Sequence, residues 1–484
     1  MSETITRRRL LGFGAVGALL AACGGAAAPT AAPTTAPAVP TKPAAATGAT
    51  AAPAASGAAS PVAGATAPAG SPAQGTPAAG APAAPATGKS IKYQQRDSST
   101  EDFVRKVYGP EFEKKTGTKV VFEDIPANEY FTKVTALFAA KQLGDLVFGY
   151  NSSGYNATWA FKGILAPHDD YIKKDNYDLK QFYDACIDAC RFEGKIYSMP
   201  PVGHPGEINI YWNKDIFQAA GAKPLDDSLT IDSIVEAAKQ TTKPDGSIWG
   251  FAADLSSWFQ IIQRVRLFGG DELSEDGKKA LMNSDQAKAA LQWEYDMRYK
   301  HKATPTPDKI QDNTGNMFTA GKVAMNGNNV ANISVYKKPI GDKFKWAPQA
   351  WPKGPGGFHG ATVHVNTTGL TTQAKEPGLA WEFLKSILTQ EVGVQKVLMG
   401  SGSPGARPDV WSDKRLTELD PWYAKANDIF KLAKAPNMAY NLRTAEVDTV
   451  MIQRVAEIML NKVTPAEGAE KMTKEMQAIL DQPR

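Results

Sequence analysis

The segment at 24–88 limits how much of this 484-residue chain can fold. It contains no aromatic residue, no Asp or Glu, and Lys42 as its one charged residue, and it consists almost entirely of Ala, Pro, Thr and Gly. A chain of this composition cannot bury enough apolar surface to offset the entropy lost on ordering, so we expect a disordered linker. Folding is therefore left to residues 89–484, which hold all ten Trp and all five His.

A targeting signal is expected at 1–22. Three arginines at 7–9 precede an apolar stretch at 10–22, which suits a signal-peptide core and is too short to span a bilayer. The stretch ends in Leu-Ala-Ala before Cys23, which resembles the lipobox of bacterial lipoproteins. The resemblance implies cleavage before Cys23, acylation of its thiol with fatty acids such as palmitate, and a linker at 23–88 that holds an exported body on the outer face of the cell membrane. The arginines resemble a twin-arginine signal, and Sec export stays open.

The charge balance argues against a nucleic-acid partner. The chain carries 54 basic and 50 acidic residues, and without residues 1–22 the counts become 51 and 49. Such a surface lacks the excess of Lys and Arg with which proteins hold a phosphate backbone. After Cys23 the sequence has no run of 18 apolar residues, so we expect no membrane-spanning helix in the body.

Two further cysteines, Cys186 and Cys190, lie four residues apart in a segment, 180–191, that has a helical pattern. Structural metal sites use more ligands at tighter spacings, so we expect no metal here. Free thiols and a disulfide both remain open, because the exterior of a cell is oxidising.

Strand-like and helix-like stretches alternate along the body, which is typical of an α/β fold. The pattern predicts strands at 90–95, 119–123 and 145–148 and helices at 101–115 and 129–141. In open α/β sheets, ligands bind beyond the carboxyl ends of the strands. The polar and aromatic residues that follow these strands are therefore candidate ligand contacts: Arg96, Asp97, Asn128, Tyr150, Asn151 and Ser152.

Several short motifs occur in a characteristic order over the whole body. They are Gly144-Asp145-Leu146-Val147-Phe148, Leu165 to Ile172, Gly194-Lys195-Ile196-Tyr197-Ser198-Met199-Pro200, Ile210 to Phe217, Ile248-Trp249-Gly250-Phe251, Phe318 to Met325, and Ser403-Pro404-Gly405-Ala406-Arg407. Together they resemble the family 1 extracellular solute-binding proteins of bacterial ABC transporters, a group that includes the maltodextrin-binding proteins. The first motif departs from the family pattern, which has Pro where this chain has Gly144.

The resemblance implies a two-lobed α/β clamp of the periplasmic-binding-protein type II class, with a hinge between the lobes. Chain crossings are expected near 204–207, 349–352 and 402–408, where Pro and Gly gather. The domain boundaries that follow are lobe one at 89–205 plus 353–405 and lobe two at 206–352 plus 406–484. A late stripe of apolar residues, from Val447 to Met459 at helical spacing, is expected to pack in the core.

The resemblance also implies a function without chemistry. A monomeric protein would capture a small solute, most plausibly a sugar or oligosaccharide, and deliver it to the transmembrane subunits of an ABC permease. It would use no cofactor and no metal, and it would not be an enzyme.

A sugar site needs aromatic platforms for C–H faces and short polar groups for hydroxyls. Trp258 follows a strand-like run at a position where the family often places a stacking aromatic, and the Asn-rich loop after 323–325 usually faces the ligand there. The further candidates, besides the strand ends, are Glu207, Trp258, Asn328, Asn329, His359 and Arg407. Four tryptophans are expected in the core instead: Trp212, Trp249, Trp293 and Trp381.

The strongest alternative is a secreted, membrane-tethered hydrolase acting on glycans. Such an enzyme needs two carboxylates flanking a crevice, and the sequence has many acids without showing their separation. A tethered adhesin is a third possibility. The glycine pattern at 400–405 does not suit a dinucleotide site, because prolines stand where the helix should begin.

Overall fold

The computed structural model describes residues 88–97, 101–150, 154–310, 312–354, 359–400 and 402–484. The targeting segment, Cys23, the linker, Asn151 and Ser152 lie outside these ranges, so the predictions made for them are not tested here. Within the described ranges, every helix is too short or too polar to cross a bilayer.

The first sheet holds five strands in the order β2-β1-β3-β11-β6. Their bounds are β1 (Ser90–Arg96), β2 (Lys119–Ile125), β3 (Leu146–Tyr150), β6 (Met199–His204) and β11 (His364–Leu370). Strand β1 is parallel to β2 and β3, whereas β11 runs antiparallel between β3 and β6. The carboxyl ends of β1, β3 and β6 and the amino end of β11 therefore share one edge of the sheet.

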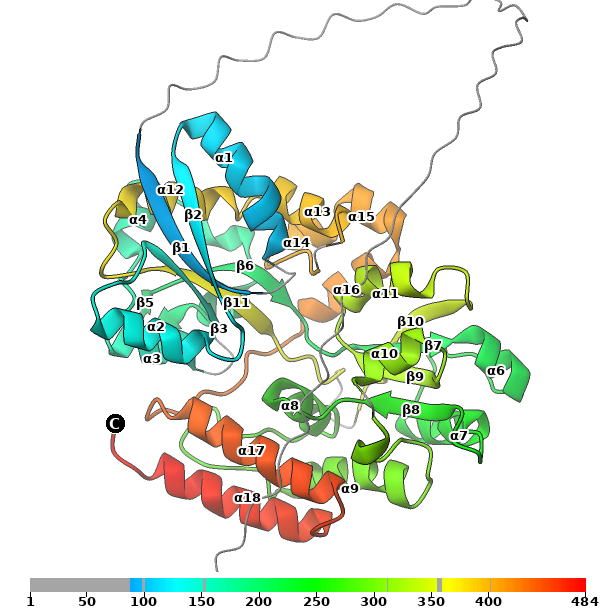
Figure 1. The fold of residues 1–484 in the computed structure, drawn as a ribbon. Coiled ribbons are helices and arrows are strands. Elements are labelled where there is room, and N and C mark those ends of the chain that lie inside the picture. The colour runs from blue at the N-terminus through cyan, green and yellow to red at the C-terminus, as the bar shows by residue number, and fades with distance from the viewer. Residues whose placement is uncertain (1–87, 98–100, 151–153, 311, 355–358, 401) are drawn as a thin grey trace, which may run out of the picture. The chain divides into compact units, whose positions relative to one another are not determined.

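The helices that accompany this sheet follow the predicted alternation (Figure 1). Their bounds are η1 (Val104–Tyr108), α1 (Gly109–Thr116), α2 (Tyr130–Ala139), α3 (Tyr155–Phe161), α4 (Asp169–Lys174), α12 (Pro377–Ser386) and α13 (Gln390–Leu398). The three predicted strands and the helix at 129–141 are confirmed within a few residues. The helix predicted at 101–115 is confirmed as well, and five of its residues, η1, have π-helical geometry before α1 begins.

The helix predicted at 180–191 is wrong in its length. The structure has a 3-10 turn η2 (Leu179–Gln181), a short α5 (Asp184–Asp188) and then a hairpin of β4 (Arg191–Phe192) and β5 (Lys195–Ile196). The hairpin turn takes positive φ at Glu193 (46°) and Gly194 (83°), which a continuing helix cannot adopt.

The second sheet has four strands in the order β10-β7-β9-β8. Their bounds are β7 (Asn209–Asn213), β8 (Trp249–Ala253), β9 (Val323–Asn328) and β10 (Trp346–Ala350). Strand β8 is parallel to β9, and β7 is antiparallel to both β9 and β10. The register pairs Asn209 with Asn328 and with Ala350, and it pairs Ala253 with Gly327, so these residues mark one edge of this sheet.

The remaining helices follow the second sheet in the chain or lie between its strands. Their bounds are α6 (Lys214–Ala220), α7 (Ile231–Thr241), α8 (Trp258–Leu267), α9 (Asp285–Tyr299), η3 (Pro307–Lys309), α10 (Thr314–Thr319), α11 (Asn332–Ile340), α14 (Pro408–Trp411), α15 (Lys414–Leu419), α16 (Trp422–Phe430), α17 (Thr444–Met459) and α18 (Pro465–Leu480). Helix α7 begins with a capping box of Thr230 and Ser233. It packs tightly on β8, since a Cβ added at Gly250 would lie 1.8 Å from the carbonyl oxygen of Ala238.

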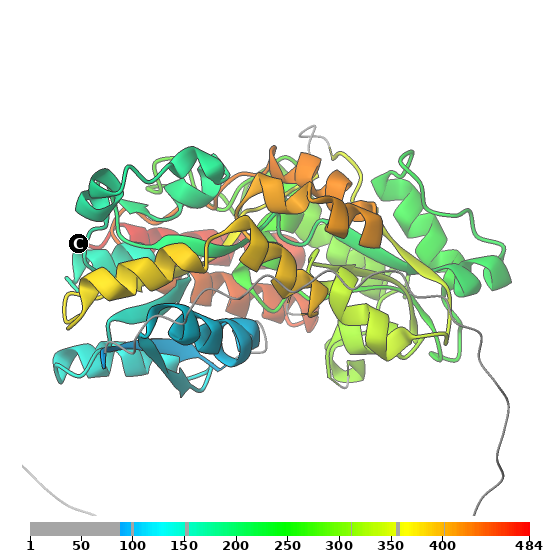
Figure 2. The same cartoon turned by 90° about the horizontal axis from the view of Figure 1, so that it is seen from above.

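The C-terminal helices α17 and α18 lie side by side (Figures 1 and 2). The apolar stripe predicted for the core is buried: Val447, Met451, Val455 and Ile458 are at most 2% exposed. These side chains share a cluster with α8, α9 and α18. A capping box of Thr464 and Glu467, followed by Pro465 in the first turn, starts α18.

A buried charge cluster connects α8 to α9. Glu294 is fully buried, accepts from Arg264 Nε at 2.6 Å, and forms an ion pair with Arg298 Nη1 at 2.8 Å. Arg264 also lies over the ring of Trp351, 4.0 Å from its centroid. One carboxylate therefore compensates two buried guanidinium groups.

We predict that Glu294→Gln destabilises the protein by about 3 kcal/mol or more, because it leaves two buried cations without a counter-charge. Urea unfolding followed by circular dichroism measures the change. Asp296→Asn on the same helix is the matched control, since Asp296 pairs with the exposed Lys300 at 3.6 Å and its charge should be worth at most about 1 kcal/mol. Equal losses of unfolding free energy in the two variants would contradict the role of Glu294 as the counter-charge of Arg264 and Arg298.

Candidate functional site

A four-residue connection at 205–208 joins the shared edge of the first sheet to the edge of the second, because β6 ends at His204 and β7 begins at Asn209. Its Gly206 has φ of 79° and donates its N–H to His204 Nδ1 at 3.1 Å. A Cβ at Gly206 would lie 2.7 Å from the carbonyl oxygen of Thr362. The two edges therefore meet at a closely packed crossing that requires glycine.

An aromatic cluster stands at this crossing, with His364 at its centre. Its ring stacks on His204 with centroids 4.7 Å apart and faces Tyr150 edge-on at 5.6 Å. From the other side, Trp258 is nearly parallel to it at 6.5 Å and Phe259 meets it edge-on at 5.0 Å. His204 and Tyr150 end strands of the first sheet, and His364 begins one. Trp258 and Phe259 begin α8, which follows β8 of the second sheet. Both sheets thus contribute rings to one cluster, in which Trp258 and His204 are only 6% and 7% exposed.

Arg96 extends the cluster from the end of β1. Its guanidinium lies over the rings of Tyr150 and Phe148, with centroid distances of 4.8 and 5.3 Å. Its Nε is buried and has no hydrogen-bond partner among the described residues. Nearby, Phe131 and Tyr155 stack with centroids 3.7 Å apart. A buried donor and several aromatic rings therefore lie side by side.

The cluster carries neutral rings at physiological pH. Burial is the main reason that the pKa of His364 is lowered to about 4; a hydrogen bond with Asn366 opposes the shift and the positive charge of Arg96 contributes to it. Burial, with His364 and Lys396 nearby, holds the pKa of His204 well below its usual range. Burial also raises the pKa of Tyr150 to about 12. Neutral imidazoles and phenols both donate and accept hydrogen bonds, as hydroxyl groups require.

Glu207 lies in the crossing itself and is 5% exposed. Burial raises the pKa of its carboxyl to about 8; the negative charge of Asp254 adds to the shift, and a hydrogen bond with Asn329 opposes it. Burial raises the pKa of Asp254 as well. The backbone oxygen of Glu207 accepts from Gln263 Nε2 at 2.5 Å, which fixes the crossing to α8. Two carboxyl groups thus stand at the second-sheet side of the site, and Glu207 is protonated at neutral pH.

Asn328 and Asn329 form the turn that closes β9. Asn328 Nδ2 donates to Tyr336 Oη at 3.0 Å, and the Asn329 N–H donates to Asn328 Oδ1 at 2.9 Å. Tyr211 Oη donates to the carbonyl oxygen of Asn329 at 2.8 Å. The turn is therefore rigid, and it places the Asn329 amide beside Glu207.

A hollow of about 390 Å³ opens next to this polar group. Asp254 and Ser256 line it from the end of β8, Asp312 and Asn313 from the segment before α10, and Met459 from α17. The combination of carboxyl groups, amides and apolar side chains suits a polar solute with C–H surface.

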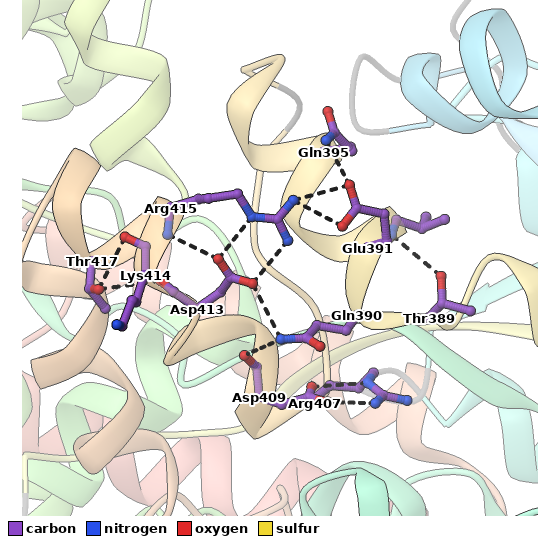
Figure 3. A network of polar contacts seen from close by, with 11 residues as sticks. Thr389, Gln390, Glu391, Gln395, Arg407, Asp409, Asp413, Lys414, Arg415 and Thr417 are labelled. Atoms are coloured by element: carbon purple, nitrogen blue, oxygen red, sulfur yellow. Dashed lines mark hydrogen bonds and ion pairs between the residues drawn. The ribbon is translucent and has the colours of Figure 1, made fainter. Parts of the chain in front are cut away.

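The structure does not bring Arg407 to this cluster. Its guanidinium pairs with Asp409 at 2.5 Å (Figure 3). It also donates to Gln181 and to the carbonyl oxygen of Leu388, and it lies over the ring of Phe182.

That ion pair belongs to a surface network across α13, α14 and α15 (Figure 3). Gln390 donates to the carbonyl oxygen of Asp409 and to Asp413, and Arg415 bridges Asp413 and Glu391.

Three other sequence candidates also lie apart from the rings. The Nδ1 of His359 is 2.5 Å from the carbonyl oxygen of Trp351. Asp97 is exposed and lies 3.8 Å from Arg105, and Asn128 is exposed in the turn before α2. The candidates that the structure does gather are Arg96, Tyr150 and Trp258 in the ring cluster and Glu207, Asn328 and Asn329 at the crossing.

Sequence reasoning missed His204, His364, Phe259 and Asp254. Asp254 directly follows a strand, so the rule used for the other strand ends would have found it. The two histidines come together only because β11 pairs with β6, which opposes His364 to His204 across 160 residues of chain.

Cys186 and Cys190 are both buried and free, which settles the choice between thiols and a disulfide in this structure. Among the described residues, His, Cys, Asp and Glu form no group that could hold a metal ion.

The chain is similar to several known binding proteins. A curated relative, the arabinooligosaccharide-binding protein of Bacillus subtilis (strain 168), is 26% identical over 267 residues, which cover 54% of this chain. The match spans about 60% of the length of that relative.

Two solved structures share the fold over 81% of this chain and 99% of their own chains. An ABC substrate-binding protein from Listeria monocytogenes in complex with cycloalternan is 18% identical, with a TM-score of 0.71. A maltose-bound MalE3 of T. maritima is 23% identical, with a TM-score of 0.69. This chain therefore has the two-lobed α/β fold of these binding proteins. Residues 97–394 match the family described as bacterial extracellular solute-binding protein, so the chain belongs to that family.

Proposed function

We propose that this protein captures a sugar or oligosaccharide between its two lobes and delivers it unaltered to the permease of an ABC importer. The observation that carries the proposal is the cluster centred on His364, in which ring faces from both sheets meet at the crossing of the chain. A solute bound there contacts both lobes at once. Its differential affinity for the closed arrangement would then draw the lobes together.

The chemistry of the site favours a neutral, hydroxyl-rich ligand. Aromatic faces such as those of Trp258 and Tyr150 cover the C–H side of a sugar ring. The carboxyl group of Glu207, protonated at neutral pH, and the amide of Asn329 suit hydroxyl groups. The names of the relatives support the same class, since one is called arabinooligosaccharide-binding and two solved structures hold cycloalternan and maltose.

The domain boundaries and the export route belong to the same proposal. Lobe one would comprise 89–205 plus 353–405, and lobe two 206–352 plus 406–484. We further propose that an acyl group on Cys23 anchors the protein to the outer face of the cell membrane, and that the segment at 23–88 tethers the body near its permease. The protein would act as a monomer.

Trp258→Ala is predicted to weaken oligosaccharide binding by more than about tenfold, because it removes a ring face from the site. Isothermal titration with maltodextrins and arabinooligosaccharides measures the affinity, after circular dichroism has shown that the variant is folded. Tyr150→Ala tests the first-sheet side in the same way.

Trp249→Ala is the matched control, since Trp249 lies at the opposite end of β8 from Asp254 and should leave sugar affinity unchanged. The glycans recovered after titration are analysed by mass spectrometry. Cleaved products would contradict the binding function, and unchanged affinity in both site variants would remove the ring cluster from the site.

Glu207 is predicted to make the free protein less stable as the pH rises. Its pKa is raised to about 8 in the folded state, so the folded protein holds a proton that the unfolded chain releases from about pH 4.5 upward. The stabilisation is complete below that pH and is lost by the time the pH has passed 8. Glu207→Gln should remove most of this slope and leave the variant more stable than the parent at pH 9, by on the order of 3 kcal/mol.

Urea unfolding between about pH 5 and pH 9 checks the slope. Glu193→Gln is the control, because Glu193 is exposed and pairs with Arg484 at 2.9 Å. Parallel pH profiles of parent and Glu207→Gln would show that Glu207 is ionised in the folded protein.

Cys23→Ser is predicted to release the protein from the membrane, because the acylated thiol would be its anchor. Cell fractionation and labelling with a palmitate analogue measure the effect, and Cys186→Ser, which alters a buried thiol, should leave both unchanged. Membrane retention of Cys23→Ser without label would rule out this anchor.

A further inference from the structure

A second hollow opens at the amino end of β8, at the other end of this strand from Asp254. It consists of two adjoining pockets of about 770 and 410 Å³, which share Asp245, Gly246, Trp249 and Lys309. Its walls come from the end of α7, the turn before β8, the end of α9 and the segment at 301–309. We call this the β8 hollow.

Cationic side chains line the β8 hollow. Lys243, Lys302, Lys309 and Lys322 are all exposed, and within the described ranges none of them forms an ion pair. Lys239 differs, because it pairs with Glu236 at 3.0 Å. The free ammonium groups therefore remain available to a ligand.

Two acids, Asp245 and Asp308, are the acidic residues among the described lining of the β8 hollow. Asp245 accepts from the backbone and the hydroxyl group of Ser247, at 2.9 and 2.7 Å. A hydrogen bond with Thr306 holds the pKa of the Asp308 carboxyl below its usual range. These neutral partners leave both carboxylates charged, but the lysines of the wall outnumber them, so the wall has a positive balance.

Thr304 adds an observation that the surface charges do not explain. It is 1% exposed, it lines the hollow, and its hydroxyl has no hydrogen-bond partner among the described residues. The Nε of Arg298, another lining residue, is buried without a partner as well, although its Nη1 pairs with Glu294. Buried donors without partners are rare in folded proteins, so an acceptor is expected at this wall.

Trp249 supplies the apolar surface of the same hollow. The ring, predicted in the core, is half-buried: it packs against core residues and also lines the hollow, with Lys309 Nζ 5.1 Å from its centroid. Such an arrangement offers a ring face beside positive charge.

Helix geometry explains only part of this pattern. Lysines following a helix favour its negative end, which accounts for Lys243 after α7 and Lys302 after α9. Lys309 is the last residue of η3 and Lys322 follows the end of α10, so helix ends suit these two lysines as well, whereas the Thr304 hydroxyl gains nothing from a helix dipole. A ligand with several oxyanion oxygens accounts for all of these groups together.

We propose that the β8 hollow binds a small phosphate-bearing molecule, with the lysines neutralising the oxyanion, the Thr304 hydroxyl donating to it, and Trp249 covering the group that carries it. This site is separate from the ring cluster at the crossing. It does not depend on the sugar-binding proposal.

The test uses inorganic pyrophosphate as the probe and isothermal titration on the folded body with its linker. Saturable binding is expected, with an affinity that falls as salt is added. The double variant Lys302→Gln/Lys309→Gln should weaken it by at least about tenfold, because two charge-assisted contacts are lost. Lys114→Gln/Lys115→Gln in α1 is the matched control with two exposed lysines, and it should bind as the parent does.

Thr304→Val separates a ligand donor from general electrostatic attraction. Because the hydroxyl has no protein partner, the isosteric valine should keep the unfolding midpoint at least as high as in the parent while weakening pyrophosphate binding. No saturable binding, or equal losses in both lysine pairs, or parent-like affinity in Thr304→Val, would each overturn the site. Sugar affinity measured on the same variants should stay at the parent value, so a failure here is distinct from a failure of sugar binding.

Discussion

The pairing of β11 with both β3 and β6 is the constraint on which the candidate site depends. Strand β11 returns the chain from the second sheet and enters the first in antiparallel register, which places His364 opposite His204 and Asn366 opposite Tyr150. Side chains alternate between the two faces of a strand, so a slip by one residue would carry His364 away from the rings. Backbone hydrogen bonds on both sides of β11 prevent that slip. The crossing at Gly206 then holds the second sheet against this edge.

The sequence correctly predicts those features of the fold that follow from the local residue pattern and from the order of the strands. Strands at 90–95 and 145–148 follow from short apolar runs, and the carboxyl ends of parallel strands must share an edge, which is why Arg96 and Tyr150 were found together. The place of β11 between β3 and β6 is a pairing of distant segments, and no local pattern encodes it. The two histidines that this pairing joins were therefore missed, although they stand at the centre of the cluster.

The sequence also could not predict which side chains contact one another in the folded protein. Arg407 stands in a motif that the family resemblance identifies, yet its guanidinium is engaged by Asp409 and Gln181, the latter 226 residues away in the chain. Trp249 was predicted in the core because large aromatic residues usually are buried. The turn before β8 and the segment at 301–309 leave its ring open, and neither can be placed from the sequence alone.

Electrostatics distinguishes the two sites that we propose. At the crossing, burial keeps the histidines neutral and Glu207 protonated, so a neutral polyol enters without meeting a fixed negative charge at that carboxyl. An anionic solute would instead be repelled by any ionised Asp254, and the cation of the ring cluster, Arg96, already lies over the rings of Tyr150 and Phe148. In the β8 hollow, Lys243, Lys302, Lys309 and Lys322 are exposed, so an anion can approach their ammonium groups from solvent. Neutral solutes therefore fit the crossing, and anions fit the amino end of β8.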